Sequence, residues 1–306
     1  MFRNSIFYSA ILLWLGGLLG AATFGEQIIE SGIRHSFLIT GNKTAIIGED
    51  CEVLWEVPGK SRDGEVLANG NVLIAFAKEV KEFTREKEMV FHYKLAEGNK
   101  EIATATRLDN GRTLIAEMGA KPRLLEVAQD GKIVVEVPVK PETGNTHMQI
   151  RMARKLANGN YLVPHLLAFA IKEYTPEGKV VRTIKTDLAE LGGREKKNWP
   201  FTAIVLDDGR VLANLTNGNK TVIFSKEGKV EWLFADKRCA DPCGGQMLAN
   251  GNVVACQYGS RGDAMPDAIE ITPEKEVVWE FKAPKFRGFH EVHVLTTNGK
   301  PAGGRR

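Results

Sequence analysis

The sequence lacks the short motifs that identify several large classes of enzyme. It contains no G-x-S-x-G nucleophile elbow, no phosphate-binding P-loop, no H-E-x-x-H zinc motif and no EF-hand loop. It also has no basic tract, and its formal net charge is only +3. A nucleic-acid-binding domain usually carries a clustered positive charge. We therefore expect neither a nucleic-acid partner nor a metal site.

Long hydrophobic runs are absent beyond the first 25 residues. One basic residue precedes an apolar run over residues 6–19, and small residues follow it. This layout predicts a signal peptide over residues 1–25, cleaved between Ala21 and Glu26. The alternative is an uncleaved N-terminal anchor. After cleavage the chain has no membrane span, so we expect an exported protein that is periplasmic or extracellular.

Cysteine is scarce, with four residues among 306. All four follow the predicted signal peptide, and export to an oxidising compartment permits disulfides. Four cysteines allow three connectivities, and the sequence does not choose among them. Two of them have C-x3-C spacing but no second pair of metal ligands beside them, which argues against zinc. The four residues are Cys51, Cys239, Cys243 and Cys256.

A repeated phrase dominates the remainder of the chain. A leucine precedes Asn-Gly or Asp-Gly, and an apolar run follows; such turns favour tight hairpins because Gly tolerates positive φ. A second apolar hairpin phrase comes after it. The first phrase occurs as LANGNVLIA (67–75), LDNGRTLIA (108–116), LANGNYLV (156–163), LDDGRVLA (206–213) and LANGNVVA (248–255). The second occurs as EDCEVLWEV (49–57), REKEMVFHY (85–93), QDGKIVVEV (129–137), PEGKVVRTI (176–184), KEGKVEWLF (226–234) and PEKEVVWEF (273–281).

Two hairpins in each unit of roughly 40–50 residues give four strands, which is the period of a β-propeller blade. A β-sandwich has strands at similar spacing but does not need the same phrase six times. The N-terminal part supplies only three strands of a blade, and residues 290–300 resemble the missing first strand. We therefore predict an all-β fold: a six-bladed β-propeller of four-stranded antiparallel blades, closed by a C-terminal strand that joins the N-terminal blade. It forms a single domain over residues 26–306.

Three blade segments carry a resemblance to a known family: LLEVAQDGKIVVEV, IKEYTPEGKVVRTI and AIEITPEKEVVWEF. They resemble the repeats of secreted bacterial quinoprotein-like (PQQ-like) propellers, and the whole chain is generally similar to arylsulfotransferase-type propellers. The resemblance implies that Trp55, Trp232 and Trp279 dock neighbouring blades. Members that use the quinone have eight blades and adjacent cysteines beside it. This chain has six repeats and no Cys-Cys pair, so we expect no PQQ and no other cofactor.

The first strand of each blade lines the central channel of a propeller, and concave, convergent places of this kind are where ligands bind. We align the six first strands on the leucine of the first phrase. Five residues before it, near the channel mouth, stand Arg62, Ala103, Arg151, Phe201, Cys243 and His290. Two residues before it, on the opposite face if side chains alternate, stand Glu65, Thr106, Arg154, Ile204, Gln246 and His293.

The first of these sets is rich in cationic donors, and the planar guanidinium fork suits carboxylate, sulfate or phosphate. We predict a small anionic or carbohydrate-like ligand at the channel mouth. The residues that bind it are Arg62, Arg151, His290, His147, Trp199 and Asp241. The alternative is that these polar groups only hydrate the channel or pair with acids of a neighbouring blade.

Two other functions remain open. The first is a propeller enzyme, a transferase or lyase, in which His147 or His290 acts as general acid or base, because histidine titrates near neutral pH. The second is a scaffold that assembles with protein partners through its rim loops. The sequence gives no match to catalytic motifs of propeller enzymes residue by residue, so binding is the function we favour.

Overall fold

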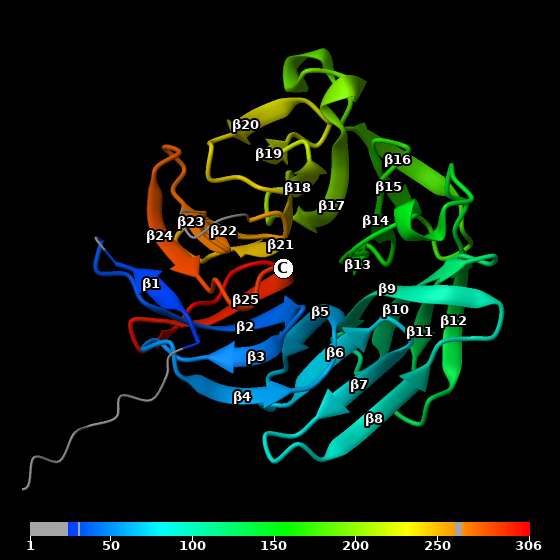
Figure 1. Cartoon of the computed structure of the whole chain (residues 1–306). Helices are drawn as coiled ribbons and strands as arrows, with labels where there is room; N and C mark the ends of the chain where they lie inside the picture. The colour runs from blue at the N-terminus through cyan, green and yellow to red at the C-terminus, as the bar shows by residue number, and fades with distance from the viewer. Residues whose placement is uncertain (1–23, 30, 261–264) are drawn as a thin grey trace, which may run out of the picture.

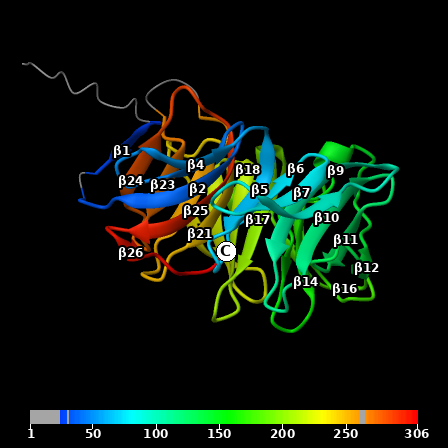
Figure 2. The same cartoon turned by 90° about the horizontal axis from the view of Figure 1, so that it is seen from below.

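The computed structural model describes residues 24–29, 31–260 and 265–306. Most of the predicted signal peptide lies outside these residues. Within them, six antiparallel sheets surround a central axis, as Figure 1 shows face-on and Figure 2 from the side. The predicted six-bladed β-propeller is confirmed. Three single-turn 3-10 helices lie in the connecting loops: η1 (Thr146–Met148), η2 (Ala189–Leu191) and η3 (Arg194–Lys196).

Each of the first three blades is built from one continuous segment, and its four strands follow one another from the channel outwards. Blade one consists of β5 (Ser61–Val66), β6 (Val72–Phe76), β7 (Glu79–Phe83) and β8 (Met89–Lys94). Blade two consists of β9 (Asn99–Arg107), β10 (Thr113–Gly119), β11 (Arg123–Val127) and β12 (Ile133–Pro138). Blade three consists of β13 (Arg154–Lys155), β14 (Tyr161–His165), β15 (Ala170–Tyr174) and β16 (Val180–Lys185). In each of them the first strand is the innermost.

The fourth and fifth blades follow the same plan, and the sixth combines both ends of the chain. Blade four consists of β17 (Asn198–Val205), β18 (Val211–Asn217), β19 (Lys220–Phe224) and β20 (Val230–Phe234). Blade five consists of β21 (Pro242–Met247), β22 (Val253–Gln257), β23 (Ala268–Ile271) and β24 (Val277–Lys282). Blade six consists of β25 (Phe289–Thr297), β2 (His35–Gly41), β3 (Thr44–Ile47) and β4 (Val53–Val57).

The closure of the ring agrees with the prediction from the sequence. The inner strand β25 comes from the C-terminal part and pairs antiparallel with β2, with His35 opposite Thr297 and Leu38 opposite His293. A second device was not predicted: β1 (Glu26–Ile28) pairs along the outer edge of β24 in blade five. The short β26 (Lys300–Pro301) adds to the inner side of blade six. Both ends of the described chain are therefore tied into sheets, which protects edges that would otherwise be open.

The repeated phrase encodes a turn that is tied to the third strand of its own blade. In LANGN of blade one, Leu67 and Asn71 close the turn, and Gly70 has a φ of 86°, which favours glycine. The side chain of Asn71 then donates to Glu82 on β7 at 2.6 Å. The same bond recurs as Arg112 to Glu126, Asn160 to Glu173 and Asn252 to Glu270. The phrase repeats because each of these blades uses one buried glutamate to hold its first hairpin.

Three of these glutamates also connect their blade to the next one around the ring. Each accepts a hydrogen bond from a cationic or histidine side chain of the following blade: Arg107 on Glu82, Lys155 on Glu126, and His35 on Glu270. The tryptophans act at the same junctions. Trp55 lies against Phe83 of blade one, Trp232 donates to the Pro273 carbonyl of blade five, and Trp279 packs edge-on against Phe37 of blade six.

Replacing Glu126 by alanine is expected to lower the free energy of unfolding by about 3–5 kcal/mol. Glu126 is buried and accepts from Lys155 and from the Tyr161 hydroxyl at 2.6 Å, so its loss leaves the buried hydroxyl and the half-buried ammonium without their partner. The matched control is Glu231→Ala, which removes an exposed carboxylate paired with Arg210 at 3.7 Å and is expected to cost at most about 1 kcal/mol. Urea unfolding of both variants is the measurement, and equal losses would contradict the role of Glu126.

Candidate functional site

A β-bulge at the start of the inner strands aims one side chain of most blades toward the channel mouth. In β5 the pairs Ser61 with Phe76 and Asp63 with Ala75 leave Arg62 as the extra residue. The same irregularity occurs in β9, β17, β21 and β25. The extra residues include Arg62, Ala103, Phe201, Cys243 and His290. Bulges of this kind reorient side chains, so strict alternation between the two aligned sets does not hold through this segment.

Arg151 reaches the same place by a different local structure. It lies before the short strand β13, in a stretch held to β14 by the bridge between Ile150 and His165 and by its own amide on the Pro164 carbonyl. The 3-10 helix η1 precedes it closely and carries His147. Blade three therefore presents both residues at the mouth from one continuous stretch of chain.

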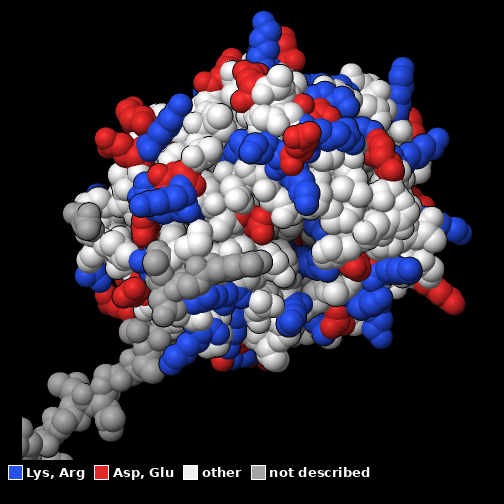
Figure 3. Space-filling view, turned by 45° about the horizontal axis from the view of Figure 1, so that its top comes forward, with Lys and Arg blue, Asp and Glu red and all other residues white. Residues whose placement is uncertain are grey.

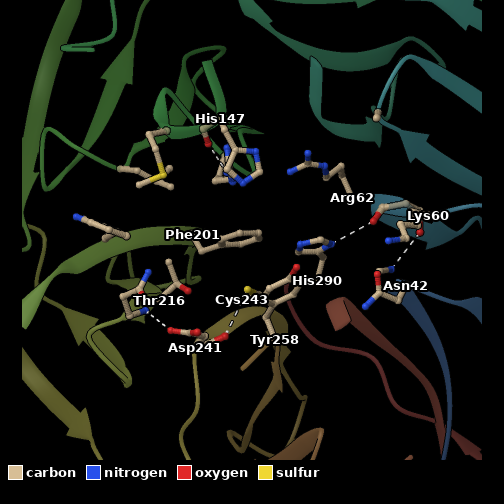
Figure 4. Close-up of a pocket in the computed structure, with 18 residues that line it drawn as sticks. Asn42, Lys60, Arg62, His147, Phe201, Thr216, Asp241, Cys243, Tyr258 and His290 are labelled. Atoms are coloured by element: carbon tan, nitrogen blue, oxygen red, sulfur yellow. Dashed lines mark hydrogen bonds between the residues drawn. The ribbon is translucent and has the colours of Figure 1, made fainter. Parts of the chain in front are cut away.

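These residues surround a cavity of about 470 Å³ at the channel mouth, shown in Figure 4. All six residues predicted for the ligand site line it: Arg62, Arg151, His290, His147, Trp199 and Asp241. Of the aligned mouth positions only Ala103 does not. The lining also includes residues that sequence reasoning did not single out: Asn42, Lys60, Met148, Leu166, Thr216 and Tyr258. The volume lies within the usual range for small-molecule sites.

Glu101 joins two of the predicted cationic groups and was not anticipated. Its carboxylate accepts from Arg62 Nη2 at 2.7 Å and lies 3.2 Å from His147 Nδ1. The hydrogen bond from His147, together with the charge of Arg62, lowers the pKa of Glu101 to about 2 against the opposing effect of burial. Arg62 thus pairs with an acid of the neighbouring blade, which is one of the alternatives that the sequence left open. Glu101 lies on β9, and nothing in its local sequence marks this contact.

Arg151 has a different environment from Arg62. It is 3% exposed, and no carboxylate forms an ion pair with it among the described residues. Its guanidinium donates to the carbonyls of Ile150, at 2.8 Å, and His147, and to the Met118 sulfur. It also lies 5.5 Å above the Phe201 ring. Burial, aided by the charge of Arg62, lowers the pKa of Arg151 to about 10, so the residue remains a cation at neutral pH.

His290 is held as a neutral imidazole in an aromatic stack. Its ring lies nearly parallel to those of Phe201, at 5.8 Å, and Tyr258, at 4.7 Å. Its Nδ1 is 3.1 Å from the Ser61 carbonyl, which can only accept, so Nδ1 carries the proton and Nε2 is an acceptor. Burial, followed by repulsion from Arg62, lowers the pKa of His290 to about 4. Figure 4 shows the ring beside Phe201 and Tyr258, with Arg62 and His147 nearby.

His290 is expected to make folding less favourable as the pH falls from about 6.5 toward 4. The unfolded chain takes up the proton near the ordinary pKa of 6.5, whereas the folded state resists it until about pH 4. The stability that depends on the neutral imidazole is therefore fully present above pH 6.5. The variant His290→Gln cannot titrate, so from pH 7 to pH 5 the wild type should lose about 2 kcal/mol more than the variant. Urea unfolding at pH 7, 6 and 5 measures both; parallel curves would contradict the buried neutral imidazole.

The other two predicted residues contribute to the rim. Asp241 has a φ of 52° and accepts from the backbone amide of Asn217, so it connects the loop before β21 to the end of β18. Trp199 lies edge-on to Phe169, with ring centres 6.5 Å apart. Its indole Nε1 is buried and makes no hydrogen bond within the described residues. Asp241 therefore positions the rim, whereas Trp199 offers a wall of the cavity.

A buried charged cluster closes the channel beyond the cavity. Arg154 donates to Asp63 at 3.2 Å and to Thr104 at 2.9 Å, and lies 3.6 Å from Glu291. At the far end Arg306 donates to the Gly64 carbonyl at 2.7 Å. It also contacts Glu65, at 3.4 Å, and His293, at 3.3 Å. Figure 1 shows the C-terminus at the centre of the ring. The cavity is therefore open at the channel mouth and bounded by this cluster on its inner side.

The four cysteines are buried free thiols in the structure. Cys243 lines the cavity, and burial raises its pKa, which keeps it protonated and unreactive at neutral pH. No cluster of three or more His, Cys, Asp or Glu side chains in the described part of the chain has the arrangement of a metal site. None of the helices described there has the length and apolar character required to cross a membrane.

Comparison with known proteins shows the fold alone. No protein-family model matches the chain, and no curated protein matches it. A solved protein of unknown function from Bacteroides caccae is 24% identical, with a TM-score of 0.74 over 85% of this chain and 98% of that one. A streptogramin B lyase is 16% identical, with a TM-score of 0.60 over 88% of this chain and 89% of the lyase.

A catalytically inactive virginiamycin B lyase from Staphylococcus aureus, solved with quinupristin, is also 16% identical. Its TM-score is 0.58 over 83% of this chain and 87% of that one. At these identities the similarity shows the propeller fold and not a shared activity. The more specific resemblance to quinoprotein-like and arylsulfotransferase-type propellers stays a prediction from the sequence. The chain is a six-bladed β-propeller with neighbours that include lyases and a protein of unknown function.

Proposed function

We propose that this chain binds a small anionic ligand in the cavity at its channel mouth. The observation that carries the proposal is Arg151, a buried cation without an acid partner among the described residues. Burying a charge is costly unless a counter-charge accompanies it. Arg151 faces a cavity of ligand size, and an anion there would supply the missing partner. The fixed backbone carbonyls around it hold the guanidinium in place.

The charges that surround the cavity support the same proposal. Three lining side chains are cationic: Lys60, Arg62 and Arg151. Glu101 and Asp241 are the acids beside them, which leaves a surplus of one positive charge from these five groups. Away from the cavity, basic and acidic side chains are interspersed on the face shown in Figure 3. The surplus of positive charge at the mouth favours an anion over a neutral sugar.

The direct test is thermal unfolding in the presence of acetate, benzoate, sulfate, phosphate and neutral sugars at constant ionic strength. A ligand at about 100 times its dissociation constant adds roughly 2.7 kcal/mol to the stability of the folded state. We expect at least one anion to raise Tm and the sugars to leave it unchanged. A Tm that responds to sugars alone, or to no member of the series, would contradict the proposal.

An enzyme is the second candidate, and His290 is the observation that favours it. Its acceptor Nε2 belongs to a neutral imidazole at the cavity, which is the form that a general base requires. Two of the structural neighbours are named as lyases. Incubation with quinupristin tests this candidate. Consumption of the compound by the wild-type protein but not by His290→Gln would replace binding with catalysis; an unchanged compound excludes lyase activity on this substrate.

We also propose that the protein is exported, because residues 1–25 have the layout of a signal peptide. Phe24 lies within the predicted cleavage window. It is buried, stacks on Phe286 at 4.5 Å and donates its amide to the Cys51 carbonyl at 3.0 Å. Cleavage ahead of Phe24 would leave these contacts intact. A protein partner on the rim remains the third possibility, and the contacts at the mouth give it no particular support.

A further inference from the structure

One wall of the mouth cavity is a stack of flat rings. Phe201, His290 and Tyr258 come from blades four, six and five, and the planes of Phe201 and Tyr258 lie within 5° and 17° of the central His290 ring. Tyr258, directly after the end of β22, is 45% exposed, so its ring is open to a ligand. Trp199 lines the same cavity. A wall of this kind favours a planar, apolar body that can stack on it.

The cation of the site lies at the end of this wall. The Arg151 guanidinium is 5.5 Å from the Phe201 ring, which is itself stacked with His290. Three of its five hydrogens have acceptors, namely two carbonyls and one sulfur. The remaining two are on Nε, which is buried without a partner among the described residues, and on Nη2. Guanidinium N–H groups form paired hydrogen bonds with carboxylates, and Arg151 lines the same cavity as the rings, so a carboxylate bonded directly to a stacked ring suits this arrangement.

The charged groups at the mouth, Glu101 among them, indicate which type of anion suits the cavity. The carboxylate of Glu101 is bound between Arg62, at 2.7 Å, and His147, at 3.2 Å, so the rim already holds one carboxylate of the protein itself. The five charged groups at the mouth leave a surplus of +1, which one monoanion neutralises. A dianion such as phosphate would reverse the sign of the site. The geometry and the charge together therefore favour a monocarboxylate.

We infer that the ligand is a planar aromatic monocarboxylate, with its ring against the aromatic wall and its carboxylate on Arg151. This inference rests on the proposed function and narrows it to one chemical class. The cavity of about 470 Å³ has room for a ligand of one or two fused rings. Arg151 would bind the carboxylate, and the aromatic wall would select a flat ring.

The test compares benzoate with two compounds that each lack one feature. Cyclohexanecarboxylate keeps the charge and loses the flat ring, whereas benzamide keeps the ring and loses the charge. Isothermal titration of the wild-type protein should show benzoate binding at least ten-fold more tightly than either. The variant Tyr258→Ala should weaken benzoate binding about ten-fold without affecting acetate. The matched control Tyr258→Phe retains the ring and should bind benzoate as the wild type does.

The outcomes separate this inference from the proposed function. Equal binding of benzoate and cyclohexanecarboxylate, unaffected by Tyr258→Ala, overturns the aromatic class and leaves anion binding standing. Equal binding of benzoate and benzamide overturns both, because charge then contributes nothing. Absence of binding by every carboxylate in the series overturns this inference, and the proposed function falls with it unless sulfate or phosphate raises Tm. Circular dichroism of each variant checks that the fold is retained. If Tyr258→Ala does not fold, the affinities of the wild-type protein for the three compounds still test the aromatic class.

Discussion

Replacing Arg151 by methionine is expected to weaken anion binding at least 100-fold while leaving the folded protein as stable as before. Methionine fills much of the same buried volume without the charge. Removing one partner of a buried ion pair costs about 2–5 kcal/mol of binding free energy. Stability should not fall, because burial already makes the charged Arg151 unfavourable and lowers its pKa to about 10. The lost hydrogen bonds to the Ile150 and His147 carbonyls offset part of this relief.

The measurement pairs titration of the best anion with urea unfolding. Lys60→Met is the matched control, since it removes an exposed cation from the same rim. It should weaken binding far less than Arg151→Met does. Retained affinity in Arg151→Met would show that the buried cation is not the anchor. A large loss of stability in the same variant would show that Arg151 is structural.

The opposite result is expected for Arg154, which stands three residues further along the same segment. Arg154→Met should lower the free energy of unfolding by about 3–5 kcal/mol. This arginine is buried with Asp63, Thr104 and Glu291 around it, and its removal leaves the buried Asp63 without its cation. These acids raise the pKa of Arg154 even though burial alone would lower it. Loss of this buried cation should therefore lower the free energy of unfolding rather than ligand affinity alone.

Unfolding curves of Arg151→Met and Arg154→Met in the same buffer form a direct comparison. Burial raises the pKa of Glu291 to about 8, so this carboxyl is largely protonated at neutral pH in the wild type, and the loss of the Arg154 charge raises the pKa further. The deficit of Arg154→Met should therefore stay nearly constant between pH 7 and pH 6. Equal stabilities for the two variants would contradict the distinction between an anchor for ligand and a support for the channel.

The fold could be predicted from the sequence because one phrase recurs in every blade but the last. The leucine and Asn-Gly pair mark a hairpin, and the glutamate two strands later holds it, so the period was visible without any contact information. The missing first strand of the N-terminal blade also pointed to closure by residues 290–300. The pairing of β1 with β24 had no such signal. Its three residues bear no repeat, and edge pairing leaves little trace in a sequence.

The candidate site was predictable in its members but not in the contacts among them. Aligned positions identified Arg62, Arg151 and His290, since the inner strands bring equivalent places to one rim. Alternation of side chains failed there, because each bulge adds a residue that changes which face the next side chain occupies. Glu101 and Tyr258 were missed. Their contacts join different blades, and a pairing between blades depends on tertiary structure alone.

The central claim is that an anion binds on Arg151 at the channel mouth, and a crystal soaked with 4-iodobenzoate tests it most directly. Iodine gives an anomalous signal that locates the ligand independently of the protein density. The account predicts an iodine peak inside the mouth cavity, with the carboxylate on Arg151 and the ring beside Tyr258. The peak should be absent from crystals of Arg151→Met. Iodine found only outside the cavity, or equally in both crystals, would contradict the account.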